Sequence, residues 1–94
     1  MTTPQIVDLH AVEACLDSCA QLSAPAATID RTADLYDLGL SSHASVNVMM
    51  AIEEALDLHF PDSLLRKSTF ASIEAILDAI ATIRTRAATD GVMQ

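Results

Sequence analysis

Aromatic residues are nearly absent from this 94-residue sequence, which has no tryptophan and only Tyr36, Phe60 and Phe70. The core must therefore be built mainly from aliphatic side chains. Glycine is also scarce, with Gly39 and Gly91 alone, so the chain has no glycine-rich loop that could cradle a nucleotide phosphate. Because alanine and leucine are abundant instead, the composition favours helices over strands.

Basic residues are few as well: five Lys and Arg stand against thirteen Asp and Glu, for a net charge of −8. None of the five lies between Arg31 and Arg66, a stretch that carries several carboxylates. This section would repel a phosphate backbone and attract a basic protein partner. We therefore expect no nucleic-acid partner.

Long apolar runs are missing too. No stretch approaches the length of a membrane-spanning helix, and the first residues have neither the basic region nor the apolar run of a signal peptide. These features lead us to expect a cytoplasmic protein that does not contact membranes and is monomeric when free. Cys15 and Cys19 lie one helical turn apart, where a crosslink would constrain nothing, so we interpret both as small apolar residues.

The spacing of the apolar residues predicts an all-α fold, a small antiparallel four-helix bundle with three longer helices, one short helix and a long first loop. The expected helices span residues 4–21, 42–58, 62–65 and 70–85. Pro61 is expected to end the second of them. We expect a single domain over residues 1–86, followed by a flexible C-terminal tail over 87–94.

Two further expectations concern particular residues of this bundle. Three carboxylates of the first helix should lie on its outer side: Asp8, Glu13 and Asp17. The long connection from residue 23 to 40 has lost the helical period, and such a loop in a small domain indicates a function or a pinned crossover. Three side chains are expected to anchor it to the core: Leu35, Tyr36 and Leu38.

Two serines meet the start of the second helix, directly after a possible sharp turn. Gly39 permits a left-handed backbone, and either Ser41 or Ser42 can cap the helix. The unpaired N–H groups of a helix N-terminus also favour a phosphate, so a serine there could carry a phosphodiester. The residues alone leave both roles open, and capping is the ordinary one.

The segment from Asp37 to His43 resembles the signature of the acyl carrier protein family, Asp-x-Gly-x-Asp-Ser-Leu. Asp37, Gly39 and Ser42 match its Asp, Gly and modified Ser, and the resemblance extends over about residues 34–83. It implies that Ser42 carries a covalent 4′-phosphopantetheine arm, added by a phosphopantetheinyl transferase. The thiol of that arm holds an acyl group as a thioester.

A narrower resemblance is to the bacterial aminoacyl carrier proteins. It implies that an amino acid:carrier protein ligase, similar to the catalytic core of seryl-tRNA synthetases, activates a small amino acid and loads it on the arm. The chain itself would then be a carrier and no enzyme. The resemblance rests on residues 39–42, 44–46, 52–55, 60–62, 64–65 and 70–73.

Several positions depart from the acyl carrier pattern, and these imply a client other than fatty-acid synthesis. The departures are Ser41, His43, Ala44 and Asn47. Together with Met50, Glu53 and Glu54 they are the expected partner contacts, Glu53 and Glu54 as a solvated acidic face. Met50 fits the core equally well. The alternatives are a carrier for a specialised acyl or polyketide-type pathway, and an unmodified acidic helical interaction module.

Catalytic and metal-binding patterns do not appear. Ser42 and His43 are neighbours, and no third residue completes a Ser-His-Asp arrangement. His10 and His59 have no Cys or carboxylate at the spacing of metal ligands. The sequence therefore predicts neither a catalytic residue nor a metal site.

Overall fold

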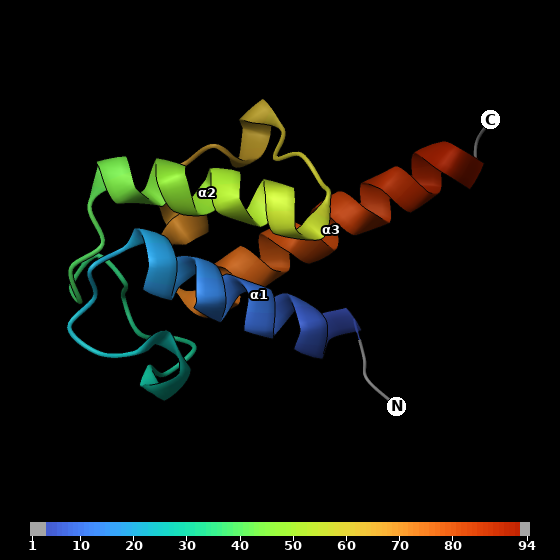
Figure 1. Ribbon diagram of the computed structural model, residues 1–94. Coiled ribbons are helices and arrows are strands. Elements are labelled where there is room, and N and C mark those ends of the chain that lie inside the picture. The colour runs from blue at the N-terminus through green and yellow to red at the C-terminus, as the bar shows by residue number, and fades with distance from the viewer. Residues whose placement is uncertain (1–3, 93–94) are drawn as a thin grey trace.

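The computed structural model describes the backbone of residues 4–92 and the side chains of residues 7–86, and every regular element in that range is helical (Figure 1). The elements are α1 (Pro4–Cys19), the 3-10 helix η1 (Ala26–Thr28), α2 (Ser42–Leu56), the 3-10 helices η2 (Asp62–Leu64) and η3 (Lys67–Phe70), and α3 (Ile73–Val92). The all-α prediction is confirmed. The expected short helix is a 3-10 turn, η2, and a second turn that the sequence did not indicate, η3, follows it.

Helix α1 packs closely against both α2 and α3, whereas the backbones of α2 and α3 come near each other at few points in the described range. In Figure 1, α1 and α2 run in opposite directions, and α3 runs in roughly the same direction as α2. The arrangement is therefore antiparallel for α1 only. The end of α1, the long first connection and the start of α2 lie together at one end of the molecule (Figure 1).

The core is aliphatic apart from two rings, as the shortage of aromatic residues requires. Phe60 and Phe70 pack with their ring centroids 5.6 Å apart. Around them, fully buried side chains come from all three α-helices and from the loop: Val12, Leu16, Leu35, Val48, Ile52, Ile73, Ile76 and Ile80. Because α1 contributes to the packing of both partners, it buries a wide face.

The second α-helix ends before the proline that was expected to end it. Asp57 adopts a left-handed conformation, with φ 52° and ψ 54°, and the N–H of Leu58 donates to the Glu53 carbonyl at 3.1 Å. This turn ends α2 at Leu56, whereas a helix ended by Pro61 could have continued to Phe60. The prediction of a helix to residue 58 was wrong because a local left-handed turn, and not the proline, stops it.

The third α-helix begins later and ends later than predicted. Its start follows Ser72, whose hydroxyl accepts a hydrogen bond from the N–H of Ala75 at 3.0 Å. Residues 70–72, expected in this helix, belong instead to η3 and the bend that follows. At the other end α3 runs to Val92 through most of the range expected as a tail.

The long first connection is pinned at several points, as its length indicated. Leu35 is fully buried, and Tyr36 and Leu38 pack against the core, so the predicted anchors are confirmed. The N–H of Leu35 donates to the carbonyl of Ala71 at 2.7 Å. The loop is thereby tied to the start of α3.

The exposed part of this connection is shaped by a carboxylate turn. Asp30 accepts hydrogen bonds from the N–H and the hydroxyl of Thr32 at 3.1 and 3.0 Å. These bonds stabilise the ionised form, the backbone one most, and lower the pKa of the Asp30 carboxyl.

Both cysteine thiols are free, Cys15 buried and Cys19 half-buried in the α1 interface, in line with the small apolar role expected of them. Burial, and to a lesser extent the neighbouring Cys19, raises the pKa of the Cys15 thiol. Among the described residues, no helix is both long enough and apolar enough to cross a membrane.

The expected outer position of Asp8 was wrong. Asp8 is only 6 % exposed, and its Oδ1 lies 2.8 Å from Nη2 of Arg84 on α3. The period of α1 indicated one apolar face, but α3 covers a second side of this helix, and Asp8 lies beneath it. Arg84 supplies the partner that a buried carboxylate requires.

We expect Arg84→Met to destabilise the fold by about 2 kcal/mol, because it keeps the aliphatic stem but leaves the Asp8 carboxylate buried without a charged partner. Asp8→Ala should cost less, since the half-exposed Arg84 head can be hydrated. Urea unfolding followed by circular dichroism measures both. Asp78→Ala removes an exposed carboxylate of α3 and is the matched control; an Arg84→Met protein as stable as this control would contradict the prediction.

Candidate functional site

The site begins with a glycine turn that only glycine can make here. Gly39 has a φ of +115°, and a Cβ atom at this position would lie 2.8 Å from the carbonyl oxygen of Gln21. One residue earlier, the carbonyl of Leu38 accepts from the N–H of Ser23 at 2.9 Å. The turn therefore packs backbone to backbone against the segment that leaves α1, and this contact fixes where α2 begins.

The two serines at the start of α2 have different roles. Ser41 is the N-cap: its backbone is extended and its hydroxyl accepts from the N–H of Ala44 at 3.0 Å. Ser42 is the first residue of the helix and is exposed, and its hydroxyl makes no hydrogen bond within the described part of the chain. The structure thus decides between the two caps that the sequence allowed.

A third serine, Ser45, also stabilises the first turn of α2. Ser45 is buried, and its hydroxyl donates to the carbonyl of Ser42 at 2.7 Å. The backbone of the first turn is held on both sides, by the Ser41 cap and by Ser45. The Ser42 side chain is left as a hydroxyl that points from a fixed backbone and is available for reaction.

The residues expected to contact a partner lie at the N-cap of α2 and along the helix. Ser41, His43 and Asn47 are exposed, and Ala44 is half-buried. Met50 is 57 % exposed, which places it on the surface and not in the core. Val46, one turn before Met50, is 50 % exposed, so the two form an apolar strip beyond Ser42.

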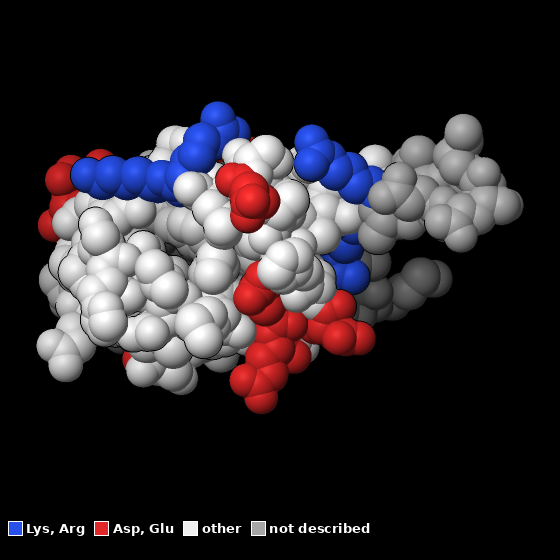
Figure 2. All heavy atoms as spheres, turned by 90° about the horizontal axis from the view of Figure 1, so that it is seen from above, with Lys and Arg blue, Asp and Glu red and all other residues white. Residues whose placement is uncertain are grey.

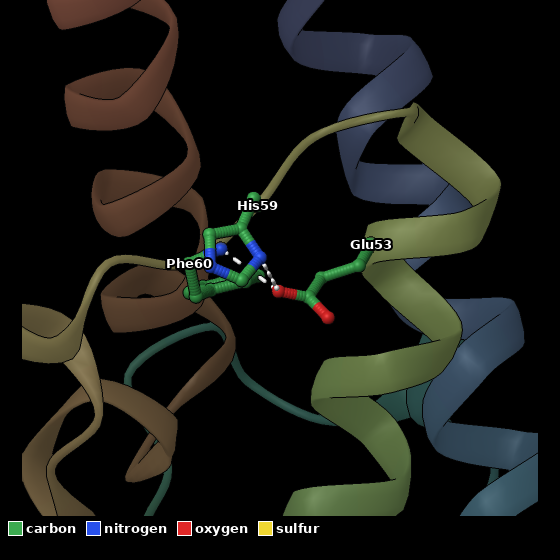
Figure 3. A network of polar contacts seen from close by, with 3 residues as sticks. All are labelled: Glu53, His59 and Phe60. Carbon is green, nitrogen blue, oxygen red and sulfur yellow. Dashed lines mark hydrogen bonds and ion pairs between the residues drawn. The ribbon is translucent and has the colours of Figure 1, made fainter.

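Glu53 is not part of a free acidic face. Its Oε2 accepts from the backbone N–H of Phe60 at 2.9 Å and lies 3.1 Å from Nδ1 of His59 (Figure 3). The carboxylate therefore ties the segment after α2 back onto the helix and helps to place the buried Phe60 ring. Glu54, its neighbour, is exposed as expected.

Beside Ser42 the surface is hollowed. The hollow has a volume of about 370 Å³, within the range of small-molecule sites. Its walls come from the first connection, the first half of α2 and the segment around η3. They are formed by Tyr36, Ser42, Ser45, Val46, Met49, Leu65, Arg66, Lys67 and Phe70.

Charge is divided unevenly along the face that carries α2. Figure 2 shows uncharged surface over much of the half where α2 begins, basic side chains along one edge with acidic side chains beside them at that end, and further acidic side chains toward the other end of the helix. The first turn of α2 has no acidic residue. The hydroxyl of Ser42 is therefore next to helix N–H groups with no carboxylate in its own turn, a favourable place for a phosphodiester.

Within the described residues, no three His, Cys, Asp or Glu side chains lie close enough together to hold a metal ion. The arrangement around Ser42 also offers no general base to its hydroxyl, since His43 is exposed on the next residue of the helix. What the geometry presents at Ser42 is an exposed hydroxyl on a fixed helical turn.

Of the residues that line the hollow, the sequence indicated only Ser42 as a site residue. Arg66 and Lys67 are the only adjacent basic pair in an acidic chain, and this signal could have singled them out. Nothing in the sequence placed them beside Ser42, because the contact depends on how the 57–72 segment returns across the start of α2.

Comparison with protein families identifies this arrangement. The model of the family described as the phosphopantetheine attachment site matches residues 16–80. The chain belongs to the phosphopantetheine attachment family. The matched range includes the glycine turn, both serines and the hollow. These residues fit a phosphopantetheine group, because they provide an exposed hydroxyl, an uncharged first turn and an adjoining cavity.

Relatives within the phosphopantetheine attachment family are similar over most of the chain. The aminoacyl carrier protein of Agrobacterium fabrum is 56 % identical over 63 residues, which are 67 % of this chain and 76 % of the relative. Two crystal structures contain similar chains. Both are of an engineered Bradyrhizobium japonicum glycine:[carrier protein] ligase complexed with a carrier protein from Agrobacterium tumefaciens, one with ATP and one with AMP.

The fold agrees closely with those structures. The match to the ATP complex has a TM-score of 0.77 at 47 % identity and covers 81 % of this chain and 99 % of the other. The match to the AMP complex has a TM-score of 0.74 at 48 % identity and covers 78 % and 97 %. The matched chain is therefore shorter than this one, and nearly all of it is covered.

We expect Gly39→Ala to destabilise the protein by roughly 3 kcal/mol, because it adds an unfavourable positive φ to a clash with the Gln21 carbonyl. Urea unfolding measures the loss. Asp37→Ala, an exposed change two residues earlier, should stay within about 0.5 kcal/mol of the parent protein. A Gly39→Ala protein that unfolds at the same urea concentration as Asp37→Ala would mean that the turn is not constrained.

Proposed function

We propose that the protein is an aminoacyl carrier whose Ser42 bears a 4′-phosphopantetheine arm. The observation that carries this proposal is the division of roles between the serines: Ser41 caps α2, which leaves Ser42 exposed, unbonded and beside a hollow. A serine needed only as a cap would not require a second one directly after it. Membership in the phosphopantetheine attachment family supports the same assignment.

The attachment reaction uses the chain as a substrate. A phosphopantetheinyl transferase removes the proton of the Ser42 hydroxyl, and Oγ attacks the phosphorus of coenzyme A that bears the pantetheine. The new Oγ–P bond replaces the pyrophosphate P–O bond, and adenosine 3′,5′-bisphosphate leaves. Once bound, the arm supplies a thiol that can hold an acyl group as a thioester. The chain's own contribution is to hold Ser42 on a fixed first turn, and in this proposal it is not an enzyme.

The proposed loading partner is an amino acid:carrier protein ligase. Support comes from the 56 % identity to an aminoacyl carrier protein and from the likeness to carrier chains complexed with a glycine:[carrier protein] ligase. Glycine is for that reason the first cargo to test. In this proposal η2 and η3 together take the place of the short helix of the expected four-helix bundle.

The exposed apolar strip of Val46 and Met50 is proposed as the ligase contact nearest the arm. The two side chains lie one helical turn apart, on the same side of α2, one and two turns beyond Ser42. Apolar side chains exposed beside a modified residue are the groups a partner can desolvate at little cost. The other partner contacts proposed are Ser41, His43, Ala44 and Asn47, with Glu54 beyond them; Glu53 contributes through the turn it holds.

The attachment site is tested by incubating the apo protein with coenzyme A and a broad-specificity phosphopantetheinyl transferase and measuring intact mass. The parent protein should gain one phosphopantetheine and Ser42→Ala none. Ser41→Ala is the matched control: it loses a cap, at a cost of about 1 kcal/mol, but should still be modified. Modification of Ser42→Ala would move the site, most simply to Ser41, and an unmodified parent protein would exclude the carrier function.

The ligase contact is tested with Met50→Asp in its holo form. We expect kcat/KM for loading glycine, with ligase and ATP present, to fall about tenfold, equivalent to about 1.4 kcal/mol, because a carboxylate would have to be desolvated at the contact. Val7→Asp changes a side chain of similar exposure, 49 %, on α1 and should load normally. Equal loading by the two variants, or equal losses, would show that the ligase does not use this strip.

A further inference from the structure

The hollow beside Ser42 is bordered by positive charge, which is unusual in this acidic protein. Two of its five basic residues, Arg66 and Lys67, border this one cavity, although the chain as a whole has a net charge of −8. They come from the segment at the start of η3, on the wall opposite α2. Figure 2 shows basic side chains along one edge of this face, between uncharged surface and acidic side chains at the end of that edge.

Neither basic side chain is neutralised by a neighbour. The ion pairs among the described residues are those of Arg84 with Asp8 and of His59 with Glu53, so Arg66 and Lys67 have no carboxylate partner there. An arginine or lysine beside a cavity with no counter-ion is free to bind an anion.

The ammonium group of Lys67 is nevertheless held in place. Its Nζ lies 4.8 Å from the centre of the Tyr36 ring, and the Tyr36 hydroxyl donates to the carbonyl of Lys67 at 3.1 Å. Tyr36 itself packs against the core and lines the hollow. The cation–π contact and the hydrogen bond therefore keep the positive charge near the cavity.

We propose that Arg66 and Lys67 bind the phosphodiester of the arm carried by Ser42, so that the arm rests in the hollow between its encounters with enzymes. This inference rests on the proposed attachment at Ser42. The phosphorus is bonded directly to Oγ of Ser42, a residue of the cavity wall, so the negative charge must lie at the mouth of the hollow. The two free cations lie at the same cavity, and the charges are complementary.

The rest of the cavity fits the part of the arm next to the phosphate. That part bears two methyl groups on one carbon, followed by a hydroxyl and two amides. The walls offer apolar contacts from Val46, Met49, Leu65 and Phe70, and polar atoms from Ser45 and Tyr36. A basic rim with an apolar floor matches a group whose charge is at one end.

The experiment compares amide chemical shifts of ¹⁵N-labelled apo and holo protein, after intact mass has shown complete conversion. Attachment alone should shift amides next to Ser42. Docking of the arm should also shift amides around residues 65–70, and raising the salt concentration should reduce this second set. In Arg66→Gln/Lys67→Gln the second set should be lost and the first retained.

The matched control is Arg31→Gln/Arg86→Gln, which makes the same change in net charge at two exposed residues away from the hollow. It should keep both sets of shifts. Holo parent protein with shifts only beside Ser42, or a double variant at 66 and 67 that keeps the second set, would overturn the inference and leave the carrier function intact. A protein that gains no mass would overturn the attachment at Ser42, and this inference with it.

Discussion

The position of Ser42 depends on the close contact between Gly39 and the carbonyl of Gln21. At that point the chain turns with a positive φ and leaves no room for a Cβ atom. The flanking hydrogen bonds, Ser23 to Leu38 and Leu35 to Ala71, tie the same segment to the end of α1 and to the start of α3. The first turn of α2 is thereby fixed relative to both other α-helices, although the backbones of α2 and α3 come near each other at few points. A serine on this turn is presented by the whole fold and not by α2 alone.

The pair of serines resolves a conflict between two demands on one helix start. The unpaired N–H groups need an acceptor, and a side chain that meets this need is bound to the backbone. A modified serine must instead be free. Here Ser41 accepts from Ala44 and Ser42 stays unbonded. Where the acyl carrier pattern has Asp, Ser41 caps equally well. It also removes a negative charge from the residue next to the proposed phosphodiester, which lowers the electrostatic cost of the modification.

The sequence predicted those features that depend on local chemistry or on the family signature. The helical class, the loop anchors, the exposed Glu54 and the serine at the start of α2 all belong to this group. The errors lie where a distant element intervenes. Asp8 is buried because α3 covers a second side of α1, and Glu53 is turned inward because the chain after α2 folds back to it. Val46 and Val48 are equally apolar, yet Val46 is exposed and Val48 takes the core position. The spacing of apolar residues in α2 does not distinguish these two valines unless it is known which side of the helix α1 covers.

The distribution of charge along α2 bears on how a partner can recognise the carrier. The carboxylates lie toward the end of the helix, and one of them, Glu53, is already bound to the His59–Phe60 segment. Glu54 and Asp57 remain exposed there. Surface charges of this kind raise the rate of encounter with a basic partner more than they raise the affinity of the complex. In the proposed function, discrimination among partners comes from the part of α2 nearer Ser42, where Val46 and Met50 are exposed and carboxylates are absent. A ligase that recognises the protein in this way would first be attracted by the charge at the far end of the helix. It would then bind through shape and apolar contact next to Ser42.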